Sequence, residues 1–317
     1  MKKILSSVLL AVGLGACQAD GAGPPSPAAQ AAAPAAPAAA AAYRAPRAPG
    51  GVHPDFNGVW QALSPANYNI EAHPAQAALQ LRAGPYVPVP DASVVALGAV
   101  GAVPAGVGIV QGDGKIPYKP EALRQRDENR MRAVELDPEV KCYLPGIPRA
   151  NYMDKPFQIF QSESQVFFLY EYLGAHRNIL LNSDEEAQLD SWMGHSVGRW
   201  EGDTLVVEVT GLLPDTWLDR SGNIKGPATK VTERWTRTSD HTLRYEATIE
   251  DPDVYTRPWK IALNLYKRVG EDAKLNQFKC VEFVEELMYG HLRRDPLPGP
   301  ALERAKREAA ERAGGAQ

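Results

Sequence analysis

Hydrophobic side chains recur at every second position over the C-terminal half of this chain, and this period limits the fold more than any other feature. In residues 242–250, Leu243, Tyr245, Ala247 and Ile249 alternate with polar residues. Successive side chains of a β-strand point to opposite faces, so the segment predicts a strand with one buried and one solvated face. Similar patterns predict further strands at 157–172, 177–182, 194–200, 204–210, 230–238, 259–268 and 275–282.

About eight strands in succession predict a mainly β fold, an antiparallel meander with one or two short helices. Because open sheet edges invite pairing with other chains, we expect the meander to close into a barrel or to fold into a sandwich. The sequence Gly58-Val59-Trp60 resembles the Gly-x-Trp first strand of lipocalin-like barrels, which favours a barrel. A helix is predicted over 120–134, where proline at the first turn precedes strong helix formers.

The N-terminus resembles the export signal of bacterial lipoproteins. Lysines at positions 2 and 3 precede an apolar run at 4–14, and small residues then lead into Cys17. The resemblance implies that residues 1–16 are removed and that Cys17 is acylated; a plain secretory leader with an incidental cysteine is the alternative. Since the apolar run is too short to span a bilayer, the acyl chains on Cys17 would hold the protein at a membrane.

The predicted location is the cell envelope. Gln18 replaces the Asp that tends to keep such lipoproteins at an inner membrane, so the resemblance favours the outer membrane, with the protein facing the periplasm or the cell surface. Residues 17–50, rich in Ala and Pro, predict a tether. Residues 51–300 predict a single β-rich domain, and 301–317 a charged tail. The net charge of -4 offers no basic footprint, which argues against a nucleic-acid partner; the oligomeric state stays open.

Cysteine usage predicts one disulfide. With Cys17 taken by lipidation, Cys142 and Cys280 remain in an oxidising compartment, where two cysteines most simply pair. A catalytic thiol or a metal pair is the alternative, but the chain has no CxxC and no histidine at ligand spacing beside either cysteine.

Longer blocks resemble a family of bacterial exported proteins with no assigned activity. The blocks are GHSVGRWEGDTLVV with the two residues before it, TLRYEATIEDPDVYTRPW, CYLPGIPR and KCVEFVEE, and the resemblance covers most of 52–295. It implies no substrate, cofactor or catalytic residue. It does place Cys142 and Cys280 in recurring blocks, which suits their pairing.

A catalytic set can be drawn from the polar residues of two blocks. His195 and Arg199 fall on one side of a predicted strand, so both could project into a cavity, as general base and anion binder. Asp219, in the loop DTWLDR, would orient the base. The alternative is structural: Arg199 pairs with a carboxylate such as Glu233 or Glu246, and Asp219 bonds backbone groups in a turn.

The predicted function is the binding of a small apolar or aromatic molecule in a barrel cavity, because barrels of about eight strands can hold one such ligand. We expect aromatic side chains to line it: Trp60, Trp192, Trp217, Tyr245 and Trp259. A cofactor-free hydrolase, lyase or isomerase using His195, or an envelope scaffold, is the alternative. No P-loop, dinucleotide fingerprint, nucleophile elbow or HExxH occurs, so we expect no cofactor and no metal.

Overall fold

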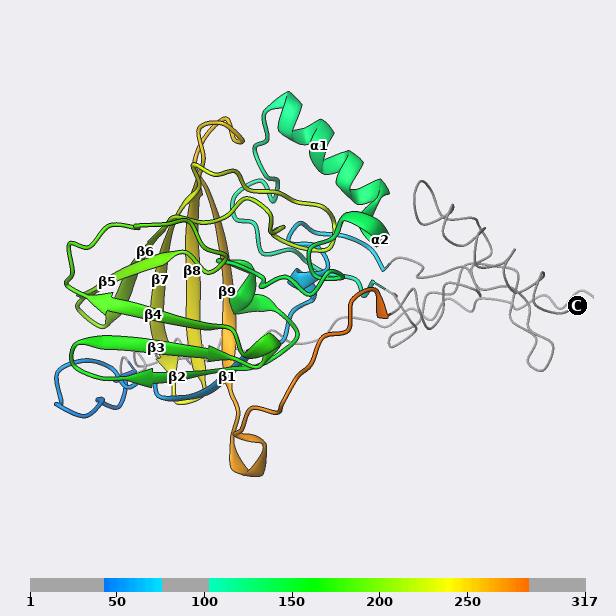
Figure 1. The fold of residues 1–317 in the computed structure, drawn as a ribbon. Coiled ribbons are helices and arrows are strands. Elements are labelled where there is room, and N and C mark those ends of the chain that lie inside the picture. Colours follow the sequence, from blue (N-terminus) through cyan, green and yellow to red (C-terminus); the bar gives the residue numbers. More distant parts are fainter. Residues whose placement is uncertain (1–42, 76–102, 285–317) are drawn as a thin grey trace, which may run out of the picture. The chain divides into compact units, whose positions relative to one another are not determined.

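Nine strands close into one barrel in the computed structural model, which describes residues 43–75 and 103–284 (Figure 1). The prediction of a mainly β, closed barrel is confirmed. Its strands are β1 Gly58–Ala62, β2 Phe157–Gln161, β3 Gln165–Tyr170, β4 His176–Leu181, β5 His195–Glu201, β6 Thr204–Thr210, β7 Lys230–Ser239, β8 Thr242–Glu250 and β9 Trp259–Lys267. The α-helices are α1 Pro120–Met131 and α2 Ala133–Leu136, and the 3-10 turns are η1 Pro65–Asn67, η2 Arg149–Tyr152, η3 Tyr172–Gly174 and η4 Gly270–Asp272.

The barrel departs from a simple meander at one pair of strands. β4 and β5 run parallel, whereas the remaining neighbours, including the closing pair β1 and β9, are antiparallel. A parallel pair needs a return connection of about a dozen residues, and residues 182–194 supply it. The all-antiparallel prediction is wrong here because alternation reveals which face is buried but not the direction of a neighbour.

Two predicted strands have different forms in the structure. The segment 157–172 is a hairpin, broken between β2 and β3 where the Ser162 hydroxyl bonds the backbone of Gln165. Residues 275–282 form no strand. They follow the barrel as an extended segment, which the disulfide between Cys142 and Cys280 attaches to residues 138–142 with a Cα–Cα distance of 5.7 Å. The predicted disulfide is confirmed.

Side chains fill the barrel interior. On β7 and β8 the buried residues alternate with outward-facing ones, as the sequence period requires. Large rings meet at the centre: Trp235 lies 4.4 Å from Tyr245 and 5.2 Å from Phe168 between ring centroids, and Phe157 lies 5.7 Å from Phe168. The interior at this level is therefore a packed core of rings.

Each end of the barrel is covered by chain. At one end all four residues of η2 are buried, and the Asn151 side chain reaches the middle of β7. At the other end, Arg237, near the C-terminal end of β7, donates to the carbonyls of Asp55 and Asp240. Residues 43–50, which the sequence assigns to the tether, pack on the barrel, with Ala45 and Ala48 buried.

Helix α1 forms where the sequence places it. It begins at Pro120, whose missing N–H is no loss in a first helical turn, and its Asn129 side chain donates to the carbonyl of Gly222. Within the described part of the chain, no helix combines the length and the apolar character needed to cross a bilayer.

Candidate functional site

The predicted base and anion binder lie on the outside of the barrel. His195 and Arg199 do share one side of β5, but the inward side carries Ser196 and Gly198 instead. The exposed guanidinium of Arg199 pairs with Glu208 at 2.7 Å and with Glu201 at 3.1 Å. Alternation alone could not tell which side of this strand faces inward, since both carry small or polar residues.

Asp219 is buried and holds a turn together. Its carboxylate accepts hydrogen bonds from the backbone N–H groups of Ile70, Ser221 and Asn223, and from the Asn223 side chain at 2.7 Å. Burial raises the pKa of this carboxyl, and the bonds from Asn223 and Ile70 act against the rise. The structure does not bring Asp219 together with His195 and Arg199 in one constellation.

The predicted aromatic residues divide between the core and one rim. Trp60 and Tyr245 are buried inside the barrel, Trp259 packs on Tyr255, and Trp217 is buried in the loop after β6. Trp192 is half-buried and packs against Tyr143 with the rings tilted and their centroids 4.7 Å apart. Cys17 lies outside the described residues.

A buried ion pair crosses the barrel interior. The guanidinium of Arg177 on β4 pairs with Glu233 on β7, and both side chains are at most 1% exposed. Asn151 and Tyr245 each donate to the same Glu233 carboxylate, at 2.9 and 2.8 Å. Charges that have left water need such complete hydrogen bonding. This arrangement has its partners within the protein, so it serves the fold.

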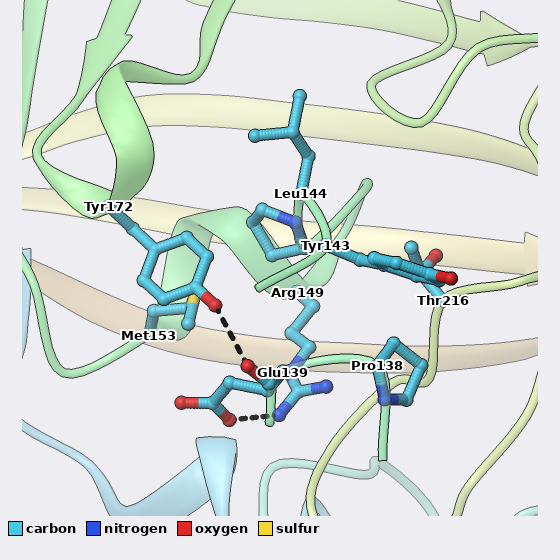
Figure 2. Close-up of a pocket in the computed structure, with 9 residues that line it drawn as sticks. Pro138, Glu139, Tyr143, Leu144, Arg149, Met153, Tyr172 and Thr216 are labelled. Carbon is cyan, nitrogen blue, oxygen red and sulfur yellow. Dashed lines mark hydrogen bonds and ion pairs between the residues drawn. The ribbon is translucent and has the colours of Figure 1, made fainter. Parts of the chain in front are cut away.

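The mouth pocket is the candidate functional site. It lies beside η2 as a shallow, partly open hollow, whose roughly 170 Å³ of empty space includes open solvent. Figure 2 shows its walls, apolar on one side and charged on another. The lining residues are Pro138, Glu139, Tyr143, Leu144, Pro145, Arg149, Met153, Tyr172 and Thr216.

Glu139 and two arginines form the charged wall. Arg220 donates to both oxygens of the Glu139 carboxylate, at 2.8 and 2.5 Å, and Arg149 donates to one of them at 2.5 Å. Burial alone would raise the pKa of Glu139, but the bonds from Arg220 and the charges of both arginines outweigh burial and lower it to about 2. The carboxylate is therefore ionised at neutral pH.

The pKa of Asp137, which lies behind this wall, is shifted in the opposite direction. It is buried, and its Oδ1 lies 3.6 Å from Nη1 of Arg149. Burial raises its pKa to about 6; the Arg149 charge opposes the rise, and the Glu139 charge adds to it. Two carboxyls with pKa values pushed apart beside a pocket are typical of functional sites, although structural ion pairs also produce the pattern.

Thr216 supplies the polar group that the fold leaves unused. Thr216 lines the mouth pocket and is 1% exposed, and its hydroxyl oxygen has no hydrogen-bond partner within the described residues. Gly146 permits this close packing: it has φ +69°, and an added Cβ would lie 2.8 Å from the Thr216 hydroxyl. An unsatisfied buried hydroxyl costs about 1–3 kcal/mol, so a protein that retains one calls for an explanation.

Several pocket residues were not predicted from the sequence, although they belong to two sequence blocks already described. Tyr143, Gly146 and Arg149 belong to CYLPGIPR, and Thr216 belongs to the loop DTWLDR beside Asp219. The available signal for Arg149 was an arginine within a Pro- and Gly-containing block. Nothing in the sequence marks Thr216, because an unpartnered hydroxyl becomes visible only when its surroundings are known.

Comparisons with known proteins leave the family open. No protein-family model and no curated protein matches the chain. Among solved structures, a mutant of the fluorescent protein UnaG is 15% identical, with a TM-score of 0.25 over 46% of this chain and 90% of the other. So low a score carries no argument about this protein.

Proposed function

We propose that this protein binds a small, largely apolar molecule in the mouth pocket. One observation carries the proposal: Thr216, which lines the pocket, has a buried hydroxyl with no partner within the described residues. A ligand atom that bonds this hydroxyl would remove the cost of leaving it unsatisfied. The walls formed by Tyr143, Leu144 and Met153 would take the apolar part of the ligand.

The location of binding differs from the sequence prediction. The aromatic residues Trp60 and Tyr245 contribute to the packed interior, and Trp235 fills the space beside them. Pockets need concavity and a few well-placed polar groups, and the mouth pocket supplies both in the described part of the chain.

Native mass spectrometry of the full chain tests the proposal. The chain would carry Cys17→Ser, so that it cannot be acylated, and would be isolated from the compartment to which it is exported. We expect a bound species of defined mass that is lost in Thr216→Val and retained in the control variant Thr256→Val. In wild type the Thr256 hydroxyl donates to the Pro117 carbonyl on the surface. An empty wild-type protein, or a ligand retained equally by both variants, would contradict the proposal.

We further propose that the protein is a lipoprotein of the cell envelope, anchored through Cys17. The support is the order of basic, apolar and small residues before that cysteine. Cells supplied with labelled palmitate should label the wild-type chain and leave Cys17→Ser unlabelled. Equal labelling of both would refute the anchor at this residue.

A further inference from the structure

In the described structure, the outer face of strands β2, β3 and β4 carries no Asp, Glu, Lys or Arg. Residues paired directly across neighbouring strands point to the same face of a sheet. The pairs here are Phe160 with Phe167 and Leu169 with His176, and buried residues alternate with them along each strand. The other outward side chains of these strands are Leu180 and three amides. We call this surface the neutral face.

Strands β7 and β8 of the same barrel carry charges on their outer face. Lys230 and Arg234 project outward from β7, and Glu246 and Glu250 project outward from β8. All four residues are exposed. Charged side chains keep a surface in water, because their removal from water without a partner is costly. The neutral face therefore lacks the groups that hold the outer face of β7 and β8 in water.

Aromatic rings form a row across the neutral face. Phe160 on β2 is 44% exposed, and its ring centroid lies 6.3 Å from that of Phe167 on β3. The Phe167 ring in turn stacks on His176 of β4, with the centroids 6.0 Å apart. These strands lie at the front of the barrel in Figure 1, and neither α-helix crosses them. Exposed apolar patches mark surfaces that meet another protein or a membrane.

The size of the neutral face favours a membrane over a protein partner. The five residues of β2 span about 17 Å, and three strands spaced about 4.8 Å apart give an area on the order of 200 Å². A stable protein interface needs about 800 Å² from each partner. A bilayer needs less, because a second attachment of the same chain to that bilayer makes the contact effectively intramolecular.

The proposed acyl anchor supplies that second attachment. Residues 18–42 separate Cys17 from Tyr43, whose hydroxyl donates to Asp240 in the turn after β7. These 25 residues could reach at most about 85 Å, whereas the ten residues of β7 span about 33 Å. The anchor would therefore hold the barrel near a membrane without choosing the side that touches it.

We propose that the neutral face is the side of the barrel that lies on the membrane. This inference rests on the proposed anchor at Cys17 and adds the surface that orients the domain. Phe160 and Phe167 would enter the boundary between headgroups and acyl chains, where apolar side chains of surface-bound proteins lie. The amides beside them can bond lipid oxygens. Since the face carries no charge, the contact does not depend on anionic lipid or on salt.

The emission of a polarity-sensitive dye on one introduced cysteine tests the inference. With Cys17 acylated and Cys142 bonded to Cys280, the introduced cysteine is the only free thiol. Asn178→Cys places the dye on the neutral face, and Glu246→Cys places it on the outer face of β8; both positions are exposed. On phosphatidylcholine vesicles carrying the full acylated chain, we expect the emission at 178 to shift to shorter wavelength relative to Cys17→Ser protein in solution. The emission at 246 should not shift.

Substitutions on the two faces show which side chains cause the shift. Phe160→Gln combined with Phe167→Gln should abolish the shift at 178, and because both rings point away from the core, the barrel should still fold. The matched control is Thr232→Gln combined with Thr248→Gln on the outer face of β7 and β8, which should keep the shift. Anionic phosphatidylglycerol in the vesicles, or high salt, should leave the wild-type shift unchanged.

The outcomes separate the orientation from the anchor. If vesicles retain the protein but the dye shifts at neither position, or equally at both, the inference fails and the anchor stands. A shift that requires anionic lipid, or that survives loss of both rings, also overturns it. Short-wavelength emission at 178 already in solution would overturn it as well, in favour of a second copy if the emission depends on protein concentration and of another segment of this chain if it does not. A chain that is not acylated at Cys17 refutes both proposals.

Discussion

At the scale of single residues, the mouth pocket is defined by groups whose bonding is incomplete or whose charge is costly. Thr216 keeps a buried hydroxyl without a partner in the described structure, whereas Thr229, equally buried, donates to Asp251 at 2.7 Å. The two threonines therefore allow a direct comparison. One hydroxyl serves the fold, and the other has no partner among the described residues.

Replacement of each threonine by valine should separate these roles. Thr216→Val removes an unsatisfied hydroxyl and should leave the free energy of unfolding unchanged or slightly higher. Thr229→Val removes a buried hydrogen bond to a carboxylate and should lower it by about 1–3 kcal/mol. Urea denaturation of both variants measures the difference. A loss of similar size in Thr216→Val would show that its hydroxyl has a partner in the folded protein.

Asp137 should make stability depend on pH. Its pKa is raised from 3.8 to about 6 in the folded protein, so the folded state binds the proton more tightly than the unfolded state. Its contribution to stability is full below pH 4 and is lost as the pH rises through about 6. Asp137→Asn lacks this loss. Its free energy of unfolding relative to that of wild type should therefore rise by an amount on the order of 3 kcal/mol between pH 4 and 8.

Denaturant unfolding at intervals across that range checks the prediction. Glu139 acts with the opposite sign. Because its pKa is lowered, it stabilises the folded protein above pH 4.5, and this contribution is lost as the pH falls toward 2. Because its pKa is about 2, Glu139 stays ionised in the folded protein from pH 4 to 8 and adds little to the difference over this range. A difference that stays constant from pH 4 to 8 would mean that Asp137 does not titrate there.

At the scale of elements, strands β4 and β7 meet across the barrel through the buried pair of Arg177 and Glu233. The pair lies between rings, and Arg177 also stacks over Phe168, 5.7 Å from its centroid. A buried ion pair is costly to form and more costly to break, because removal of one charge leaves the other without a partner. Residues on the outer face of the same sheet have no such constraint.

Glu233→Gln should therefore destabilise the barrel by about 3–5 kcal/mol. The matched control is Glu246→Gln on the outer face of β8, whose carboxylate is half-exposed and lies 3.8 Å from Arg244. Exposed pairs contribute about 0–1 kcal/mol. Thermal unfolding of both variants compares them. Equal melting temperatures would show that Arg177 finds another acceptor.

At the scale of the whole molecule, one disulfide connects the loop before β2 to the segment that follows the barrel. The bond joins Cys142 to Cys280, and nearby contacts support it: Phe278 packs on Tyr172, and the backbone N–H of Asn276 donates to Glu171. Tyr172 also lines the mouth pocket. The segment 275–284 therefore supports one wall of the proposed binding site.

Loss of the disulfide should lower the free energy of unfolding by about 5 kcal/mol in the chain-entropy model, given a sequence separation of 138 residues. The double variant Cys142→Ser, Cys280→Ser should also be cut by proteases within 275–284 sooner than wild type. Wild type treated with a thiol reductant is the matched control and should behave like the variant. Two free thiols in the untreated native protein would contradict the disulfide.

The sequence alone determined most of the strands, and on β7 and β8 also the buried face, because a period of two follows directly from strand geometry. Residues 275–282 were wrongly predicted as a strand. The sequence also determined the pairing of Cys142 with Cys280, since only two cysteines remain after Cys17. The direction of β4 relative to β5, and the outward side of His195 and Arg199, depended on neighbouring strands.

Only the tertiary structure decided where a ligand could bind. The mouth pocket combines residues 138–145, η2, η3 and Thr216, which are far apart in the chain. No local pattern indicates that Arg149 pairs with Asp137 and Glu139 or that the Thr216 hydroxyl lacks a partner among the described residues, because both properties depend on what the folded chain places around them. Local periodicity specifies strands and core faces, whereas burial, charge compensation and unmet hydrogen bonds exist only in the assembled barrel.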